Sequence, residues 1–196
     1  MRDNETGSYW QQITGRAILG PLKGTALELV STDELSFQLF RKESPLGQVL
    51  TADTANEKEY DKDWEKNEAG LPTVIKFSDN VLPLKEVVIG ISFSGEDRAY
   101  PLAKIAETGV IVDKLGGVPI IVVAAEDNKS VRAFRSEGHE FFRKSGKEWA
   151  LMDSSGGEWD FRGCDRNGKC LEPVGALKDF WFDWRLYHPR TSVYQH

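Results

Sequence analysis

The chain has 196 residues, of which 40% are hydrophobic and 29% are charged, and its formal net charge at pH 7 is −6. This length supports one sizeable core or two small lobes that share one. The acidic balance, without a Lys/Arg-rich stripe, excludes the electrostatic footprint of a nucleic-acid-binding protein. The longest apolar run, residues 118–125, is too short for a membrane span and indicates a buried strand. The first twenty residues lack the basic-then-apolar pattern of a signal peptide.

The chain opens with "MRDNETGSYWQQITG", which has the composition of a turn followed by a strand. Only two residues precede the turn at Asp3, so the strand that would pair with "SYWQQIT" is absent. The sequence therefore predicts either a piece of a longer protein or an edge that some other strand fills. Because a naked edge strand is an aggregation hazard, we expect a partner chain or self-association to complete the sheet at this N-terminal edge.

Few helices are expected, and all of them are short. The cap and stop signals place them at residues 34–42 after Thr32 or Asp33, at residues 102–107 before Gly109, and at residues 177–187 before Pro189. The polar, highly charged segment 51–73 indicates a long surface connection that Tyr60 and Trp64 hold down.

The strand signals dominate the rest of the chain. Residues 87–94 alternate, with Val87, Ile89, Ile91 and Phe93 on one face, and "SGED" turns them into "RAYPL". The turns "SEGHE" and "KSGKE" join strands between residues 131 and 152, and "DSSGGE" closes a hairpin between "KEWALM" and "WDF". The predicted fold class is therefore mainly β with a few short helices, built from antiparallel sheets.

The chain also carries a diverged internal repeat. Residues 24–49 align without gaps to residues 168–193, with seven identities in 26 positions, and Phe37 and Phe40 fall over Trp181 and Trp184. Duplication explains this match better than chance. We therefore expect residues 1–50 to be the C-terminal part of a first repeat, 51–84 a charged connector and 85–196 a second, complete repeat, together in one compact unit.

Four stretches carry a resemblance to a known family: "DNETGSYWQQITGRAILGPLKGTALE", "RAYPL", "VIVDKLGGVPIIVV" and "FWFDWRLYHPRTSVY". Together they resemble the domain of unknown function 3179 family over nearly the whole chain. The resemblance implies tandem copies of one β-rich unit, the first with an upstream Tyr-Cys-Pro-Leu-Cys type stretch. This chain lacks that stretch, and the matching place in its second copy is "VVAAEDN". The resemblance implies no established activity.

The loop "DNETGSYW" and its echo "DSSGGEW" are the first candidate site. Their carboxylates and hydroxyls suit a divalent cation or a polyol on which an indole stacks, and no other cofactor is evident. The alternative is a structural turn, since Asp, Ser and Gly are turn residues and Trp fills cores. The ligand-binding candidates here are Asp3, Thr6, Ser8, Trp10, Asp153 and Trp159.

Two further motifs have a binding and a structural interpretation. Arg98 is a candidate for holding an anion through its planar fork, with Tyr100 as a hydrogen-bond donor, although both residue types are also common in sheets. Cys164 and Cys170 flank "DRNG", whose Asn-Gly step favours a type I′ turn that would bring the cysteines into disulfide range. A bridge would indicate an extracytoplasmic location, whereas two free thiols would fit the cytoplasm.

Two functions follow from these observations. The first is a non-catalytic binding or interaction module that presents the duplicated turns and the Arg98–Tyr100 region to a small ligand or a partner chain. The alternative is a metal- or carboxylate-dependent hydrolase that uses Asp3 and Glu5 with Asp153, because paired carboxylates can divide acid and base roles.

Overall fold

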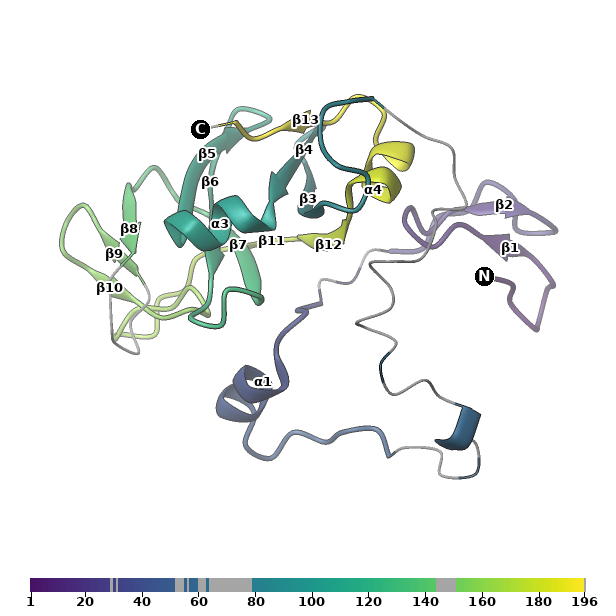
Figure 1. Cartoon of the computed structure of the whole chain (residues 1–196), viewed down its shortest axis with the longest axis horizontal. Coiled ribbons are helices and arrows are strands. Elements are labelled where there is room, and N and C mark those ends of the chain that lie inside the picture. Colours follow the sequence, from purple (N-terminus) through teal and green to yellow (C-terminus); the bar gives the residue numbers. More distant parts are fainter. Residues whose placement is uncertain are drawn as a thin grey trace.

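The computed structural model describes residues 1–28, 30, 32–51, 55, 57–59, 63, 79–143 and 151–195. Within these residues the chain is mainly β, with four small sheets and three short α-helices (Figure 1). The described helices are α1 (Phe37–Glu43), α3 (Leu102–Thr108) and α4 (Trp181–Tyr187), and a 3-10 turn, η1, spans Glu57–Glu59. The predicted fold class is confirmed.

Each sheet is small, and one strand pairing among the described residues is parallel. The first sheet joins β1 (Tyr9–Trp10) to β2 (Ala17–Leu19), and the second has the order β10 (Glu158–Trp159), β9 (Leu151–Asp153), β8 (Phe141–Arg143). The third has the order β11 (Pro173–Val174), β7 (Val131–Arg135), β6 (Val118–Ala124), β5 (Val110–Leu115). The fourth has the order β12 (Leu177–Phe180), β3 (Val87–Phe93), β4 (Glu96–Pro101), β13 (Ser192–Val193), in which β13 runs parallel to β4.

Strand β6 lies at the centre of the core. Ile120, Val122 and Ala124 enter one hydrophobic cluster, and Ile121 and Val123 enter another on the opposite face of the sheet. A strand that is buried on both faces needs apolar residues at every position, because successive side chains point to opposite sides. This double burial explains the unbroken apolar run of residues 118–125.

Helix α4 packs on the β3–β4 hairpin. Trp181 and Trp184 share a buried cluster with Val88 and Ala99. A Cβ atom at Gly90 would lie 2.2 Å from Trp184 Cε3, so only glycine leaves room for the indole at this point of β3. We call this position the Gly90 notch.

Two of the three predicted helices begin later than expected. Helix α1 starts at Phe37 because the Ser36 hydroxyl, rather than Thr32 or Asp33, caps it by accepting a hydrogen bond from the Leu39 amide at 3.3 Å. Residues 177–180 form β12 instead of the first turns of a helix, since they pair with β3. The third prediction is confirmed, because α3 ends at Gly109 in the left-handed conformation.

The hairpins predicted at "SGED" and "DSSGGE" are present, whereas "SEGHE" joins β7 to β8, which lie in different sheets and do not pair with each other. Ile89, Ile91 and Phe93 face one core cluster, and β9 and β10 pair across the turn at residues 154–157. Residues 147–150 of the expected "KEWALM" strand, the turn "KSGKE", Tyr60 and Trp64 lie outside the described residues. No helix in the described parts of the chain is long and apolar enough to cross a membrane.

The N-terminal hairpin forms a lobe at one side of the molecule (Figure 1). Its first strand is flanked on the side opposite β2 by the two residues that precede Asp3. The Trp10 amide donates to the Met1 carbonyl at 2.7 Å, and Arg2 forms a β-bridge with Tyr9. The two residues before Asp3 thus contact this edge of β1 through one isolated bridge, and completion of the sheet by another chain stays a prediction from sequence.

Candidate functional site

The turn at Asp3 is organised by the Asp3 carboxylate. Oδ1 accepts hydrogen bonds from the Thr6 and Gly7 amides at 2.6 and 3.1 Å, and Oδ2 accepts one from the Trp10 indole at 2.8 Å. The bonds from Trp10 and Thr6 lower the pKa of Asp3 to about 2. The Thr6 hydroxyl also contacts the Ser8 hydroxyl at 2.7 Å. These predicted ligands therefore bind one another, while Glu5 lies exposed outside the network.

Asp153 repeats this arrangement in the β9–β10 turn. Oδ1 accepts from the Ser155 and Gly157 amides at 2.9 and 2.8 Å, and Oδ2 accepts from the Trp159 indole at 2.8 Å. Burial alone would raise the pKa of Asp153, but hydrogen bonds from Ser155 and Trp159 outweigh it and lower the pKa to about 2. The two carboxylates thus hold an amide-rich turn and an indole, which is a structural use of acceptor oxygens.

Arg98 and Tyr100 converge on Asp113, a residue that the sequence reasoning missed. Arg98 Nη1 and the Tyr100 hydroxyl both donate to Asp113 Oδ2, at 2.6 and 2.8 Å. Tyr100 is completely buried, and this burial, with the hydrogen bond to Asp113, raises its pKa. The sequence pattern that could have identified Asp113 is its position two residues from both Ile111 and Leu115, on the core-facing side of β5. The Arg98 guanidinium, which was predicted to bind an anion, thus binds the Asp113 carboxylate of its own chain.

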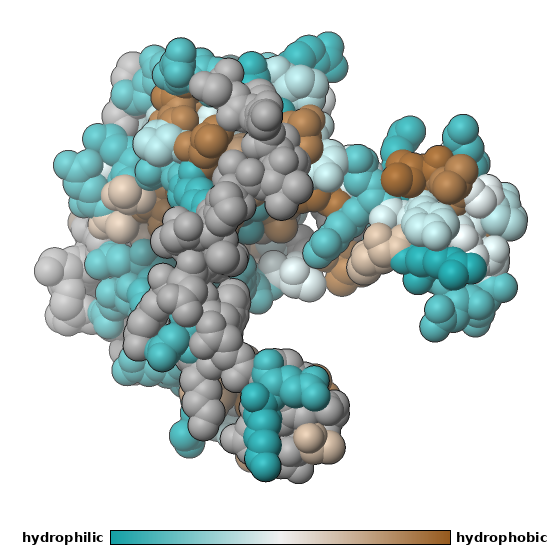
Figure 2. Space-filling view, turned by 45° about the vertical axis from the view of Figure 1, so that its right-hand side comes forward, coloured by the Kyte–Doolittle hydropathy of each residue, from teal (hydrophilic) through white to brown (hydrophobic). Residues whose placement is uncertain are grey.

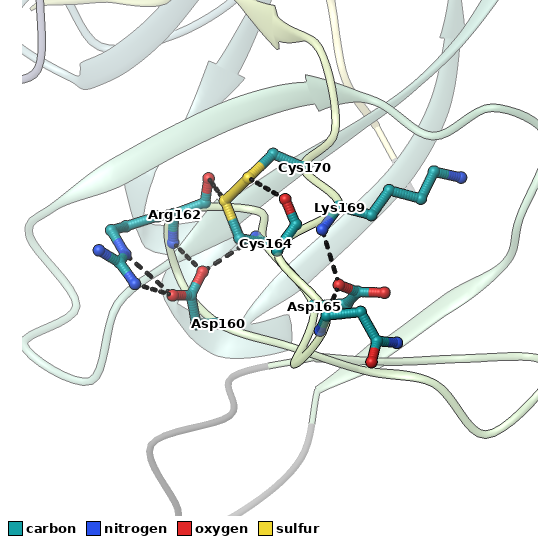
Figure 3. The surroundings of a disulfide bond; sticks show 8 residues. Asp160, Arg162, Cys164, Asp165, Lys169 and Cys170 are labelled. Atoms are coloured by element: carbon teal, nitrogen blue, oxygen red, sulfur yellow. Dashed lines mark hydrogen bonds and ion pairs between the residues drawn. A yellow bond between two sulfur atoms is a disulfide. The ribbon is translucent and has the colours of Figure 1, made fainter.

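The cysteines form a disulfide, Cys164–Cys170, so of the two alternatives the bridged one is present (Figure 3). The Asp165 carboxylate accepts from the Asn167 and Lys169 amides, both at 2.8 Å. The predicted type I′ turn is wrong. Among the residues between the cysteines only Gly168 has a positive φ, and its amide donates to the Asp165 carbonyl, as in a type I turn followed by a left-handed glycine.

A cleft of about 400 Å³ lies between the segment 32–34 and the β7, β11 and β12 strands. Two ion pairs hold the segment over it: Arg132 Nη2 binds Asp33 Oδ2 at 2.6 Å, and Lys178 Nζ binds Glu34 Oε1 at 2.7 Å. Arg132 also donates two hydrogen bonds to Glu43 of α1, at 2.9 and 2.8 Å. These partners are far apart in the chain, and nothing in the local sequence pattern indicated them.

Exposed apolar side chains gather in the N-terminal part of the chain. The lobe that projects to the right in Figure 2 carries brown, apolar side chains on its outer surface. Beyond this lobe, Phe37 of α1 is 60% exposed and Leu46 is 96% exposed. Among the described residues between positions 9 and 50, the exposed large hydrophobic ones are Tyr9, Ile18, Leu19, Leu22, Leu27, Val30, Phe37, Leu46, Val49 and Leu50, which we call the exposed apolar set.

Helix α1 is anchored on the core by leucine side chains, while its two phenylalanines lie outside the core clusters of the described residues. Leu35 and Leu39 pack against the cluster that contains Phe134, and the Ser36 amide donates to the Ser130 hydroxyl at 2.9 Å. Phe37 and Phe40 stack on each other at 6.4 Å and belong to none of the core clusters in the described chain. Leu39 therefore anchors the helix, Phe37 is exposed, and Phe40 is half-buried with its ring against Gly47.

The described residues contain no group of three or more His, Cys, Asp or Glu side chains that could hold a metal ion. The divalent cation remains a prediction from sequence.

Comparisons with known proteins identify one similarity. A family model described as a protein of unknown function (DUF3179) matches residues 1–191. No curated protein and no solved structure matches the chain.

Proposed function

We propose that this chain, which belongs to the DUF3179 family, is a non-catalytic interaction module that binds another polypeptide through the exposed apolar set of residues 9–50. The observation that carries the proposal is the exposure of Phe37 on α1 and of Leu46, Val49 and Leu50 after it, next to a helix that Leu39 anchors on the core. Exposed apolar surface rimmed by polar residues marks interaction sites, since burial of that surface drives association.

The geometry favours this function over the hydrolase. Both oxygens of Asp3 and of Asp153 accept hydrogen bonds from their own turns. The low pKa of about 2 in each case keeps these groups ionised and unsuited to act as a general acid near neutral pH. The interaction module needs neither carboxylate as a catalyst.

Sedimentation velocity of the purified chain tests the proposal. We expect the average mass to rise with protein concentration, because two copies of the chain can bury their exposed apolar side chains against each other in a weak association. The double variant Phe37→Ser/Leu46→Ser removes apolar surface from α1 and the residues that follow it, and should reduce the association. Gln38→Ser, an exposed polar position on the same helix, is the matched control. A chain that stays monomeric at every concentration, or association that the double variant retains, contradicts the proposal.

The disulfide supports an oxidising, extracytoplasmic compartment for this module. A Cys164–Cys170 bridge persists where thiols are not kept reduced. The intact mass of the chain purified from its native compartment, measured without reductant after thiol alkylation, tests this inference. An unalkylated chain supports it, and two alkylated cysteines contradict it.

A further inference from the structure

The cleft beneath residues 32–34, a segment that we call the strap, has an apolar floor. Its volume of about 400 Å³ is within the range of pockets that hold small organic molecules. The floor includes Ile89, Ala133 and Val174, which are buried and belong to the same core cluster as Ile120. The cleft therefore opens onto the side of the core, where the apolar part of a ligand would be shielded from water.

Four cationic side chains also line this cleft: Lys129, Arg132, Arg162 and Lys178. The two arginines are bound by carboxylates of the chain itself. Arg132 is only 10% exposed and binds both Asp33 and Glu43, and Arg162 binds Asp160 at 2.8 Å. These guanidinium groups therefore hold parts of the fold together, and Arg132 in particular fixes the strap over the cleft.

The two lysines are available to a ligand in a way that the arginines are not. Among the described residues, Lys129 forms no ion pair. Lys178 Nζ binds Glu34 Oε1 at 2.7 Å, but the Glu34 side chain is 66% exposed, so water competes with this pair and its net strength is small. An exposed carboxylate of the strap thus occupies a cationic position that another carboxylate can take.

We propose that this cleft is a binding site for a small organic carboxylate with an apolar body. The body lies on the floor beneath the strap, and the carboxylate binds Lys129 and Lys178 in place of Glu34. The strap already presents this chemistry to the cleft, because Asp33 and Glu34 each place a carboxylate on one cation. No member of the exposed apolar set lines the cleft, so the site goes beyond the proposed function.

Nuclear magnetic resonance titration of the isotope-labelled chain with naphthalene-2-carboxylate tests the proposal. The amide signals of residues 129–134 and 174–178 should move, and the movement should saturate with probe concentration. Two matched ligands separate the parts of the probe: naphthalene-2-carboxamide keeps the rings without the charge, and acetate keeps the charge without the rings. Each should bind at least about tenfold more weakly than the probe, because the site needs both the ion pair and apolar burial.

Two single substitutions should change the affinity for the probe in opposite directions. Lys129→Glu should weaken binding at least about fivefold, because it replaces an attractive charge by a repulsive one. Glu34→Gln should tighten binding about two- to fivefold, since it removes the competing carboxylate from Lys178 while Asp33 still holds the strap. The control Lys104→Gln changes a lysine of α3 outside the cleft lining and should leave the affinity unchanged.

Three results would overturn the inference: no saturable movement of the cleft signals up to about 10 mM probe, equal binding of the carboxamide, or an affinity that Glu34→Gln does not raise. Signals that move only in residues 9–28 and 37–50 would also overturn it. They would place the probe on the exposed apolar set and leave the proposed function standing. The same spectra show whether each variant is folded, so a change in affinity is read only from folded protein.

Discussion

The substitution Gly90→Ala should destabilise the fold through one contact. The added Cβ would lie 2.2 Å from Trp184 Cε3 and 2.4 Å from Cδ2, well inside van der Waals contact. The indole has nowhere to move, because its Nε1 donates to the Thr191 hydroxyl at 2.9 Å and its ring stacks on His188 with centroids 3.6 Å apart. Overpacking of a buried site typically costs 1–3 kcal/mol, and the closeness of this contact places the expected loss at about 3 kcal/mol.

For a chain of this length that loss corresponds to a fall in melting temperature of about 6–12 °C. Thermal unfolding followed by near-ultraviolet circular dichroism measures it directly, since Trp181 and Trp184 are in the affected cluster. Gly95→Ala is the matched control: its Cβ meets no atom within 4 Å, but its φ is +82°, so it should cost only about 1 kcal/mol. If both variants melt within about 2 °C of each other, the notch does not act as we describe.

Three further predictions concern charged groups. Asp153→Asn should lower the free energy of unfolding by about 1–3 kcal/mol at pH 7. Because the folded protein lowers the pKa of Asp153 to about 2, the difference between wild type and variant should disappear as the pH falls from about 4 to 2. A difference in urea unfolding that does not change with pH would refute this prediction. Asp179→Asn should stabilise the fold by about 1–2 kcal/mol at pH 7, because burial raises the pKa of Asp179 to about 6 in the folded protein. This gain in stability should vanish as the pH falls from about 6 to 4. A variant that is less stable than wild type at pH 7 would refute the prediction. Arg132→Gln should lower the free energy of unfolding by about 2–4 kcal/mol and speed amide exchange in α1, because Arg132 is 10% exposed and binds Glu43. The control Arg135→Gln changes a residue of the same strand that is 43% exposed, and should cost at most about 1 kcal/mol. Equal losses of stability would contradict the role of Arg132 in anchoring α1.

The sequence predicted those elements whose signal is local. The alternation of residues 87–93 and the apolar run of β6 identified strands, because burial on one or two faces imposes a period that the residues display directly. The glycine at 109 identified the end of α3 through its left-handed conformation. The aspartate and glycine of the two turns indicated turns for the same reason.

The features that were missed depend on contacts distant in the chain. Residues 177–180 look helical in isolation, but pairing with β3 makes them a strand. Asp113 and Arg132 gain their roles from Tyr100 and Glu43, which no local pattern connects to them. The exposure of Phe37 was also unpredictable, since its counterpart Trp181 is an ordinary core residue.

The most direct test of the central claim is amide hydrogen exchange of the natural chain at low and high concentration. Association through the exposed apolar set predicts added protection at high concentration in residues 33–50 and in the N-terminal hairpin, with little change in β3 to β7. Protection confined to β3 to β7, or no change in residues 33–50 while the mass rises, would contradict the assignment of this surface as the docking site.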